Sequence, residues 1–392
     1  MPLSGKLNRL ASRFRQRFTP TGRSAPLLST AETLDLSAPD VALDPFPYYA
    51  ELRQSGPVHF LPRNGFWLVI GFDELSFALL QPQLFSSRVP DWLAVDDVLL
   101  GCDPPEHTLV RRVVGHLFSA PAVAAQNAFA EQAAERLLKP LRAGGTLDAL
   151  RDFGAPLSEE VVAHLLGFDE PTLAAVRATQ GKANDLSQWL ASLDSVIGTA
   201  ANRIPIYRQI LQDSDGRLDE AQAVSLIRLL WIAGTTTTRR AIASSVLLLL
   251  RHSSIRSEVA SDQSLLPAFV EESLRLQPPE HSISRVVTTE VELSGVKIPA
   301  GALVKLCLAA ANRDPAQFSD PASLLLSRKP NLQLSFGGGI HRCVGAALAR
   351  LEVTAALRVL LRLAPQFRSV QPLDTLPFVG FNNDSEQLVI EC

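Results

Sequence analysis

The sequence has few cysteines, and none of them stands in a metal-binding pair. Its 392 residues include four, Cys102, Cys307, Cys343 and Cys392, with no Cys-x-x-Cys spacing. This pattern excludes a disulfide scaffold and a zinc finger, and it favours a cytosolic, cytoplasmic location. A role for any one thiol must therefore be indicated by its own local sequence.

Long apolar runs and an excess of one charge are also missing. In the most apolar region, 218–250, Arg228, Arg239 and Arg240 leave uncharged pieces far shorter than the roughly 20 residues that cross a bilayer. The N-terminus lacks the apolar stretch of a signal peptide. Lys and Arg number 37 against 40 Asp and Glu, a net charge of −3, which gives no electrostatic basis for binding nucleic acid. We therefore expect no transmembrane segment and no nucleic-acid partner.

Basic charge is concentrated in one place, residues 1–31. This segment has no acidic residue, and apolar residues recur in it every three or four positions: Leu3, Leu7, Leu10, Phe14 and Phe18. The spacing predicts a short basic amphipathic helix. Two interpretations stay open, a leader packed on its own acidic domain, or weak peripheral attachment of residues 1–24 to anionic lipid or an acidic partner.

Two short regions carry the signals of β-hairpins. Residues 57–72 alternate around Asn64-Gly65, and residues 286–306 contain Ser294-Gly295. Such dipeptides adopt the tight turns that join antiparallel strands. The sequence therefore predicts a small β component.

Helical periodicity dominates the rest of the chain. It is expected over 45–55, through most of 104–280 and over 344–364, with an extended C-terminal end. One helix over 219–252 would be about 50 Å long. No repeat or linker divides the chain. We expect a mostly α protein with small β-sheets (α+β), organised as a leader over 1–31 and a single domain over 32–392.

The stretch from Phe336 to Arg350 is the most informative. Three consecutive glycines allow positive φ angles and a close approach of the backbone to a bulky group. An amphipathic helix follows at once, so Cys343 is expected at a helix N-terminus, where a thiol is stabilised as thiolate. A single thiolate beside His341 suits an axial metal ligand near an anionic cofactor.

This stretch resembles a known signature. Phe336-x-x-Gly339-x-His341-x-Cys343-x-Gly345 is similar at every defining position to the heme-binding signature of the cytochromes P450, and the resemblance to the soluble bacterial type extends from about residue 40 to the C-terminus. It implies the family's fold, a triangular prism with a long central helix. It also implies heme b (Fe-protoporphyrin IX) with Cys343 as ligand to the iron, and a monooxygenase that oxidises, most simply hydroxylates, a small secondary-metabolite or lipid-like substrate.

Further residues follow from the resemblance. Glu272 and Arg275 match the family's ExxR motif, which implies a buried structural network completed by Arg328. Four donors match positions that bind the heme propionates, an arrangement that suits buried carboxylates: His107, Arg111, Arg285 and His341. Phe336 and Ala233 are expected against the cofactor.

The segment from Trp231 to Thr238 permits two interpretations. Four consecutive threonines are poor helix formers whose hydroxyls can bond to i−4 carbonyls, so the helix could open into a polar groove for O₂. Alternatively, the hydroxyls are satisfied along their own helix. By resemblance, Thr237 is the oxygen-activating alcohol, with Ala233 and Gly234 against the heme.

Here the sequence departs from the family pattern. The residue before the catalytic threonine is usually acidic, but this chain has Thr236, and no carboxylate lies between Glu220 and Glu258. Proton delivery must then use hydroxyls and water, the substrate, or a residue from elsewhere. Peroxygenase, desaturation or oxidative-coupling chemistry therefore stays open beside hydroxylation.

Pocket and partner residues are also carried over by position. The substrate is expected against an apolar set with a few polar groups: Leu229, Ile232, Ala233, His281, Ser282, Ile283, Ser284, Phe378 and Val379. No flavin or iron–sulfur module is recognisable. Electrons are therefore expected from a separate ferredoxin and its reductase, with Arg112, Arg342 and Arg350 able to meet an acidic donor.

Two other classes of function compete with this prediction. One is a heme protein that binds or senses without turnover, against which the retained Thr237 argues. The other is a hydrolase that uses Cys343 and His341, which explains neither the ExxR pair nor the propionate set.

Overall fold

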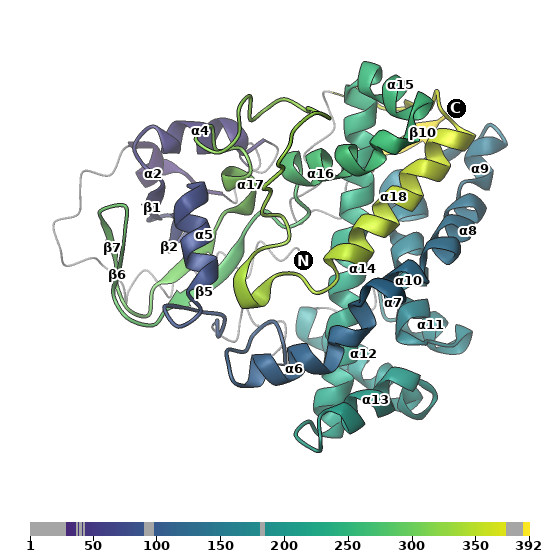
Figure 1. Ribbon diagram of the computed structural model, residues 1–392, viewed down its shortest axis with the longest axis horizontal. Helices are drawn as coiled ribbons and strands as arrows, with labels where there is room; N and C mark the ends of the chain where they lie inside the picture. Colours follow the sequence, from purple (N-terminus) through teal and green to yellow (C-terminus); the bar gives the residue numbers. More distant parts are fainter. Residues whose placement is uncertain are drawn as a thin grey trace. The chain divides into compact units, whose positions relative to one another are not determined.

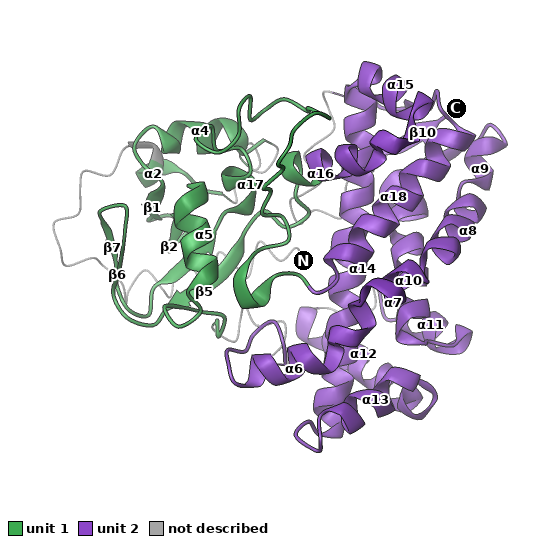
Figure 2. Cartoon of the chain, in the orientation of Figure 1, with its two compact units in different colours: residues 1–94, 274–343, 377–383 green, residues 95–273, 344–376, 384–392 purple. Residues whose placement is uncertain are grey.

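The computed structural model describes residues 29–36, 38, 41, 44–89, 98–180, 185–373 and 387–392. They fall into two compact units, one within 1–94 and 274–343 and the other within 95–273, 344–376 and 384–392 (Figure 2). Most of the predicted leader lies outside the described residues. Among those described, no helix has both the length and the hydropathy that a membrane crossing needs.

The first unit is built around a β-sheet (Figure 1). Five strands are ordered β1-β2-β8-β5-β3, with β2 and β8 parallel and the other pairs antiparallel. Its elements are α2 (Ser29–Thr33), α4 (Phe46–Arg53), β1 (Val58–Leu61), β2 (Phe66–Val69), α5 (Phe72–Leu80), β3 (Phe85–Ser86), β5 (Ile283–Val287), β6 (Val291–Leu293), β7 (Val296–Ile298), β8 (Leu303–Leu306), α17 (Leu308–Ala311) and the 3₁₀ turn η5 (Gly339–His341).

Both predicted hairpins are present in this unit. β1 pairs with β2 around a turn that contains Gly65, whose φ is 74°. β6 pairs with β7 through Ser294 and Gly295, whose φ values of 48° and 79° are the two positive angles of a type I′ turn. The turn dipeptides therefore predicted the strands correctly.

The second unit is mainly helical, as predicted for 104–280 and 344–364. Its helices are α6 (Glu106–Gly115), η1 (His116–Phe118), α7 (Ala120–Ala124), α8 (Asn127–Leu137), α9 (Lys139–Arg142), the π-helix η2 (Ala149–Gly154), α10 (Ala155–Leu166), α11 (Glu170–Arg177), α12 (Leu186–Ala200), η3 (Ala201–Arg203), α13 (Pro205–Asp213), α14 (Glu220–Arg251), α15 (Ser253–Ser261), η4 (Gln263–Leu265) and α18 (Ala346–Leu363). Strands β4 (Thr146–Asp148), β10 (Val389–Glu391) and β9 (Arg368–Ser369) form a small antiparallel sheet. One further helix, α16 (Leu266–Leu276), begins in this unit and ends in the first unit.

The long predicted helix is α14, with 32 residues. A capping box fixes its start: the Asp219 side chain accepts from the Gln222 N–H at 2.8 Å, and the Gln222 side chain accepts from the Asp219 N–H at 3.0 Å. Most of the helix is buried, and it packs against α10, α12 and α18. Threonine is a poor helix former, so the helix is stabilised mainly by its tertiary contacts.

Candidate active site

The loop before Cys343 is shaped by its glycines. Gly337 and Gly339 have φ values of 63° and 62°, a conformation that other residues rarely adopt. The Cys343 N–H donates to the Phe336 carbonyl at 2.8 Å, which closes the loop. Cys343 is exposed and forms no disulfide, and α18 begins three residues later with Gly345 as its N-cap. The loop therefore presents a thiol just before a helix start, as predicted.

The same loop packs tightly on α5. A Cβ atom at Gly339 would lie 2.1 Å from the Leu79 carbonyl oxygen, and one at Gly338 would lie 3.2 Å from the Leu79 side chain. The His341 ring Nε2 also lies 2.9 Å from the hydroxyl of buried Ser87. These contacts hold the loop against α5 and against the residue that follows β3.

Arg275 of the ExxR pair anchors the chain that leads to this loop. Its buried guanidinium donates to the carbonyls of Asn312, Pro321 and Ser323, at 3.1, 2.7 and 2.8 Å. Arg328 donates to the Ser323 carbonyl as well, and both guanidinium groups lie within 6 Å of the Phe318 ring centre. The structure thus brings Arg275 and Arg328 together. Glu272 is buried three residues earlier on α16.

Two residues not predicted from the sequence continue this network. The Asn312 side chain donates to the Ser335 hydroxyl at 2.8 Å and accepts from the Leu334 N–H at 2.6 Å. Ser335 in turn donates to the Leu274 carbonyl at 2.8 Å. The buried arginine is therefore linked by hydrogen bonds to the residue that precedes Phe336. Asn and Ser side chains that bond to the backbone have no spacing rule, so the sequence carried no signal for them.

Arg285 and His341, two of the predicted propionate donors, lie in the first unit. Arg285 is on β5, is 6% exposed, and donates to the Ser284 carbonyl at 2.7 Å. The other two, His107 and Arg111, lie four residues apart on α6 of the second unit, where His107 is buried and Arg111 is half-buried.

The threonine run of α14 does not open the helix. The hydroxyls of Thr235, Thr236 and Thr237 donate to the carbonyls four residues earlier, at 2.8, 2.7 and 2.8 Å. The helix continues through the run to Arg251. Of the two interpretations, the structure therefore shows the one in which the hydroxyls are satisfied along their own helix.

Gly234 lies close to a neighbouring helix. A Cβ atom there would lie 2.8 Å from the side chain of Val162 on α10, so this glycine permits a close helix–helix contact. That Gly234 lies against the heme stays a prediction. Ala233 is exposed, Ile232 is half-buried, and Leu229, one turn earlier, is buried.

The predicted pocket residues of the first unit lie beside α4 and on β5. His281 is 7% exposed, and its ring centre is 6.1 Å from that of Phe46. The guanidinium of Arg313 lies 3.4 Å from the centre of the same Phe46 ring, and burial lowers the pKa of Arg313 to about 10. Ile283 is half-buried at the start of β5. Phe378 and Val379 lie outside the described residues.

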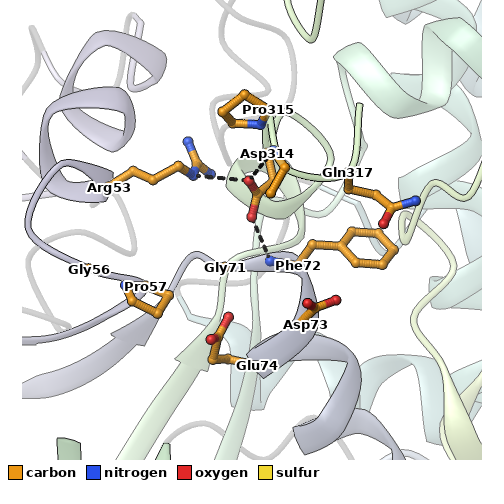
Figure 3. Close-up of a pocket in the computed structure, with 11 residues that line it drawn as sticks. Arg53, Gly56, Pro57, Gly71, Phe72, Asp73, Glu74, Asp314, Pro315 and Gln317 are labelled. Atoms are coloured by element: carbon orange, nitrogen blue, oxygen red, sulfur yellow. Dashed lines mark hydrogen bonds and ion pairs between the residues drawn. The ribbon is translucent and has the colours of Figure 1, made fainter. Parts of the chain in front are cut away.

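A separate cavity of about 350 Å³ lies beside α4 and α5 (Figure 3). Asp314 accepts from the Phe72 N–H at 2.9 Å and lies 3.8 Å from the Arg53 guanidinium. Arg53 also donates to the carbonyls of Ile70 and Ala310. Within the described ranges, none of the predicted site residues lines this cavity, and the ion pair of Arg53 with Asp314 ties elements of the first unit together.

Of the three arginines expected to meet an electron donor, Arg350 is already engaged. Its guanidinium makes a two-pronged ion pair with Glu271 across α18 and α16, with one contact at 3.0 Å. Arg112 and Arg342 are exposed. A bidentate pair holds its arginine in place, so Arg350 has little freedom to bind another protein.

Comparison with known proteins shows the family of this chain. The family model described as Cytochrome P450 matches residues 201–377. Cytochrome P450 109 of Bacillus spizizenii is 32% identical over 82% of this chain and 85% of its own length. The cytochrome P450 monooxygenase PikC of Streptomyces venezuelae is 33% identical over 85% of this chain and 87% of its own length.

A similarity to solved structures extends over most of the chain. The myxobacterial cytochrome P450 CYP267B1, solved in complex with myristic acid, is similar with a TM-score of 0.79 at 27% identity, over 91% of this chain and 98% of that one. The chain belongs to the cytochrome P450 family, in the bacterial branch. It is a heme-binding monooxygenase, and the predictions of fold, cofactor and enzyme class are confirmed.

Proposed function

We propose that Cys343 is the thiolate ligand of the heme iron and that the enzyme hydroxylates a small lipid-like or secondary-metabolite substrate. The observation that carries this proposal is the loop itself: an exposed thiol follows two glycines of positive φ and precedes the start of α18. Thiolate ligation favours cleavage of the O–O bond, and the heme, when bound, supplies that oxidative chemistry.

The side chains of the first unit fit this cofactor. Cys343 is a soft anionic ligand of the kind that binds iron, and its exposure leaves it accessible. Arg285 and His341 are nitrogen donors of the kind that propionates require. We assign the propionates to these two residues together with His107 and Arg111, and a contact with the ring to Phe336 and Ala233. Glu272, Arg275 and Arg328 have a structural role in this proposal.

Thr237 is the proposed oxygen-activating residue, with Thr236 beside it. Each hydroxyl donates its proton to a carbonyl of its own helix, which leaves the oxygen lone pairs to accept a hydrogen bond. To donate a proton, either hydroxyl must first rotate away from its carbonyl. No carboxylate of α14 lies near enough in sequence to resupply the proton, so water, the substrate or a residue of another element must do so. This is why peroxygenase, desaturation and oxidative-coupling chemistry stay as alternatives.

The substrate proposal rests on apolar residues and on one related protein. Leu229, Ile232 and Ala233 follow one face of α14, and His281 and Ile283 add a second element. We place the substrate against these residues. The related CYP267B1 binds myristic acid in its solved structure, and this supports a lipid-like substrate here.

The remaining assignments concern organisation and partners. We propose a ferredoxin and its reductase as electron donors, which bind near Arg112 and Arg342, and a single catalytic domain over 32–392 behind the basic leader. The four cysteines form no disulfide among themselves, in keeping with a cytoplasmic enzyme.

Turnover with labelled oxygen tests the proposal. Holoenzyme would receive a surrogate ferredoxin, its reductase, NADPH and ¹⁸O₂, with myristic acid as probe, and products would be analysed by mass spectrometry. We expect one ¹⁸O atom per product molecule. Products that form only with hydrogen peroxide would favour a peroxygenase, and heme protein that oxidises no donor with any substrate would favour a binding or sensing protein.

A further inference from the structure

One buried serine is bonded to the histidine of the Cys343 loop. Ser87 directly follows β3, the edge strand of the five-stranded sheet, and is 3% exposed. Its hydroxyl oxygen lies 2.9 Å from the ring Nε2 of His341, which ends η5 two residues before Cys343. The His341 residue is half-buried. This hydrogen bond therefore joins the edge of the sheet to the loop that carries the thiol.

The register of the sheet places Ser87 beside Arg285. β3 pairs antiparallel with β5, and Phe85 lies opposite Val287. Two residues further along, the same register sets Ser87 opposite Arg285. Residues opposite each other project to one face of a sheet, and so do residues two apart along a strand. Phe85 and Val287 pack in one apolar cluster with residues of α5, so Ser87 and Arg285 project to the face that α5 covers.

The Cys343 loop rests against the same helix. Gly338 lies against the side chain of Leu79 on α5, and Leu79 belongs to that apolar cluster. Ser87 therefore adjoins two of the residues that we assign to the propionates, Arg285 across the strand pair and His341 on the loop. A strand and a loop far apart in sequence each bring one nitrogen donor to this buried hydroxyl.

The hydrogen bond at one ring nitrogen of a histidine determines what the other nitrogen can do. When the Ser87 hydroxyl donates to Nε2 of His341, the proton of the neutral ring is on Nδ1, which can then donate to an oxyanion. A hydroxyl can also accept from Nε2–H of a charged ring, which again has a proton on Nδ1. A serine at this position therefore suits a histidine whose Nδ1 is a donor.

We propose that Ser87 is a positioning residue of the heme site, which holds the His341 ring so that Nδ1 donates to a heme propionate on the face that carries Arg285. This inference rests on the proposed function, because it takes His341 and Arg285 as the propionate donors. It adds a residue that acts through His341. A donor that offsets the negative charge of a propionate also favours the ferrous over the ferric iron, so the reduction potential reports on this contact.

Redox titration of the holoenzyme tests this assignment. Ser87→Ala removes the hydroxyl and little volume. We expect the reduction potential of the heme to fall by about 30–60 mV, which corresponds to a threefold to tenfold change in the ratio of ferric to ferrous heme. Transfer of heme to an excess of apomyoglobin should become severalfold faster. The carbon monoxide spectrum should keep its thiolate-type band, because Cys343 is unchanged.

Two single variants serve as controls. Ser86→Ala removes the neighbouring buried hydroxyl, which accepts from the Arg88 N–H at 3.0 Å and belongs to the opposite face of the sheet. It should change neither the potential nor the heme transfer. Ser87→Thr keeps a hydroxyl and should retain the wild-type potential and heme content, so it tests the assignment even if Ser87→Ala binds heme poorly.

A double-mutant cycle with His341→Ala shows whether Ser87 acts through the histidine. In the His341→Ala background, Ser87→Ala should change the potential no further. A residue that only stabilised the fold would lower the potential equally with and without the His341 side chain.

Two results would overturn the assignment: an unchanged potential in Ser87→Ala, or an equal fall in the presence and absence of the His341 side chain. The carbon monoxide spectrum of the wild type separates these outcomes from a failure of the proposed function. A wild type without the thiolate-type band would count against Cys343 ligation, whereas an intact band with an unchanged potential in Ser87→Ala would count against Ser87 alone.

Discussion

The loop before Cys343 and the threonine run of α14 carry the two strongest motifs of the sequence, but they are constructed differently. In the loop, the backbone conformation positions the thiol, through two glycines of positive φ and one backbone hydrogen bond. In α14, the backbone is an ordinary helix and the side chains alone differ. The loop geometry is therefore specified locally, whereas the role of the threonines depends on what meets their hydroxyls.

This difference predicts how each region tolerates change. A substitution in the loop that alters backbone freedom should remove the cofactor site altogether. A substitution in the threonine run should leave the fold intact and change only proton delivery and the amount of product formed for each NADPH consumed. The predictions below test this contrast, from the largest expected effect to the smallest.

Gly339→Ala should have the largest effect. The new Cβ would lie 2.1 Å from a backbone carbonyl, in a conformation that already disfavours side chains, so we expect a loss of stability of about 3 kcal/mol and loss of bound heme. Gly295→Ala is the matched control, because its φ is also positive but nothing lies within 4 Å. It should cost about 1–2 kcal/mol and keep the heme. Chemical denaturation and the Soret absorbance measure both, and equal losses would contradict the packing argument.

Arg275→Met should come next. Three carbonyls would lose a buried donor, at about 1–3 kcal/mol for each group left unsatisfied. We expect poor heme incorporation and a loss of at least about 3 kcal/mol. Arg328→Met, which shares the Ser323 carbonyl but is half-exposed, should cost about 1 kcal/mol. If the two variants were equally stable, the anchoring role of Arg275 would be wrong.

Glu352→Gln tests how the stability of the helical unit depends on pH. Glu352 lies buried on α18, its carboxylate oxygens make no hydrogen bond in the described structure, and burial raises its pKa well above 4.5. Since the folded state keeps the proton that the unfolded state loses, the wild type loses stability as pH rises above about 4.5. The variant should therefore melt several degrees higher at pH 8, with the difference shrinking toward pH 4.5. A constant difference across this range would exclude the ionisation as its cause.

Thr236→Asp should have the smallest effect on the fold and a specific effect on turnover. It places a carboxylate beside Thr237, so we expect severalfold more product for each NADPH consumed, with little change in melting temperature. Thr236→Asn, similar in shape but uncharged, should not improve coupling. Unchanged coupling in Thr236→Asp would remove proton supply as the limiting feature.

The sequence predicted the features that depend on a few neighbouring residues, and it did not predict those that depend on tertiary contacts. The hairpins, α14, α18 and the Cys343 loop were predictable because turn dipeptides, periodicity and glycine position act within a few residues. Asn312, Ser335 and Ser87 were not, because each bonds to a partner that only the fold brings near. The continuous helix at the threonine run and the contact of Gly234 with Val162 also depend on tertiary packing, which overrides local helix propensity.

The central claim, that Cys343 is the thiolate ligand of the heme, is tested most directly by the carbon monoxide difference spectrum of the reduced protein. We predict the strongly red-shifted Soret band of thiolate ligation in the wild type and its loss in Cys343→Ser, with both proteins folded by circular dichroism. A wild-type band at the position typical of histidine ligation, or a red-shifted band that survives in Cys343→Ser, would contradict the account.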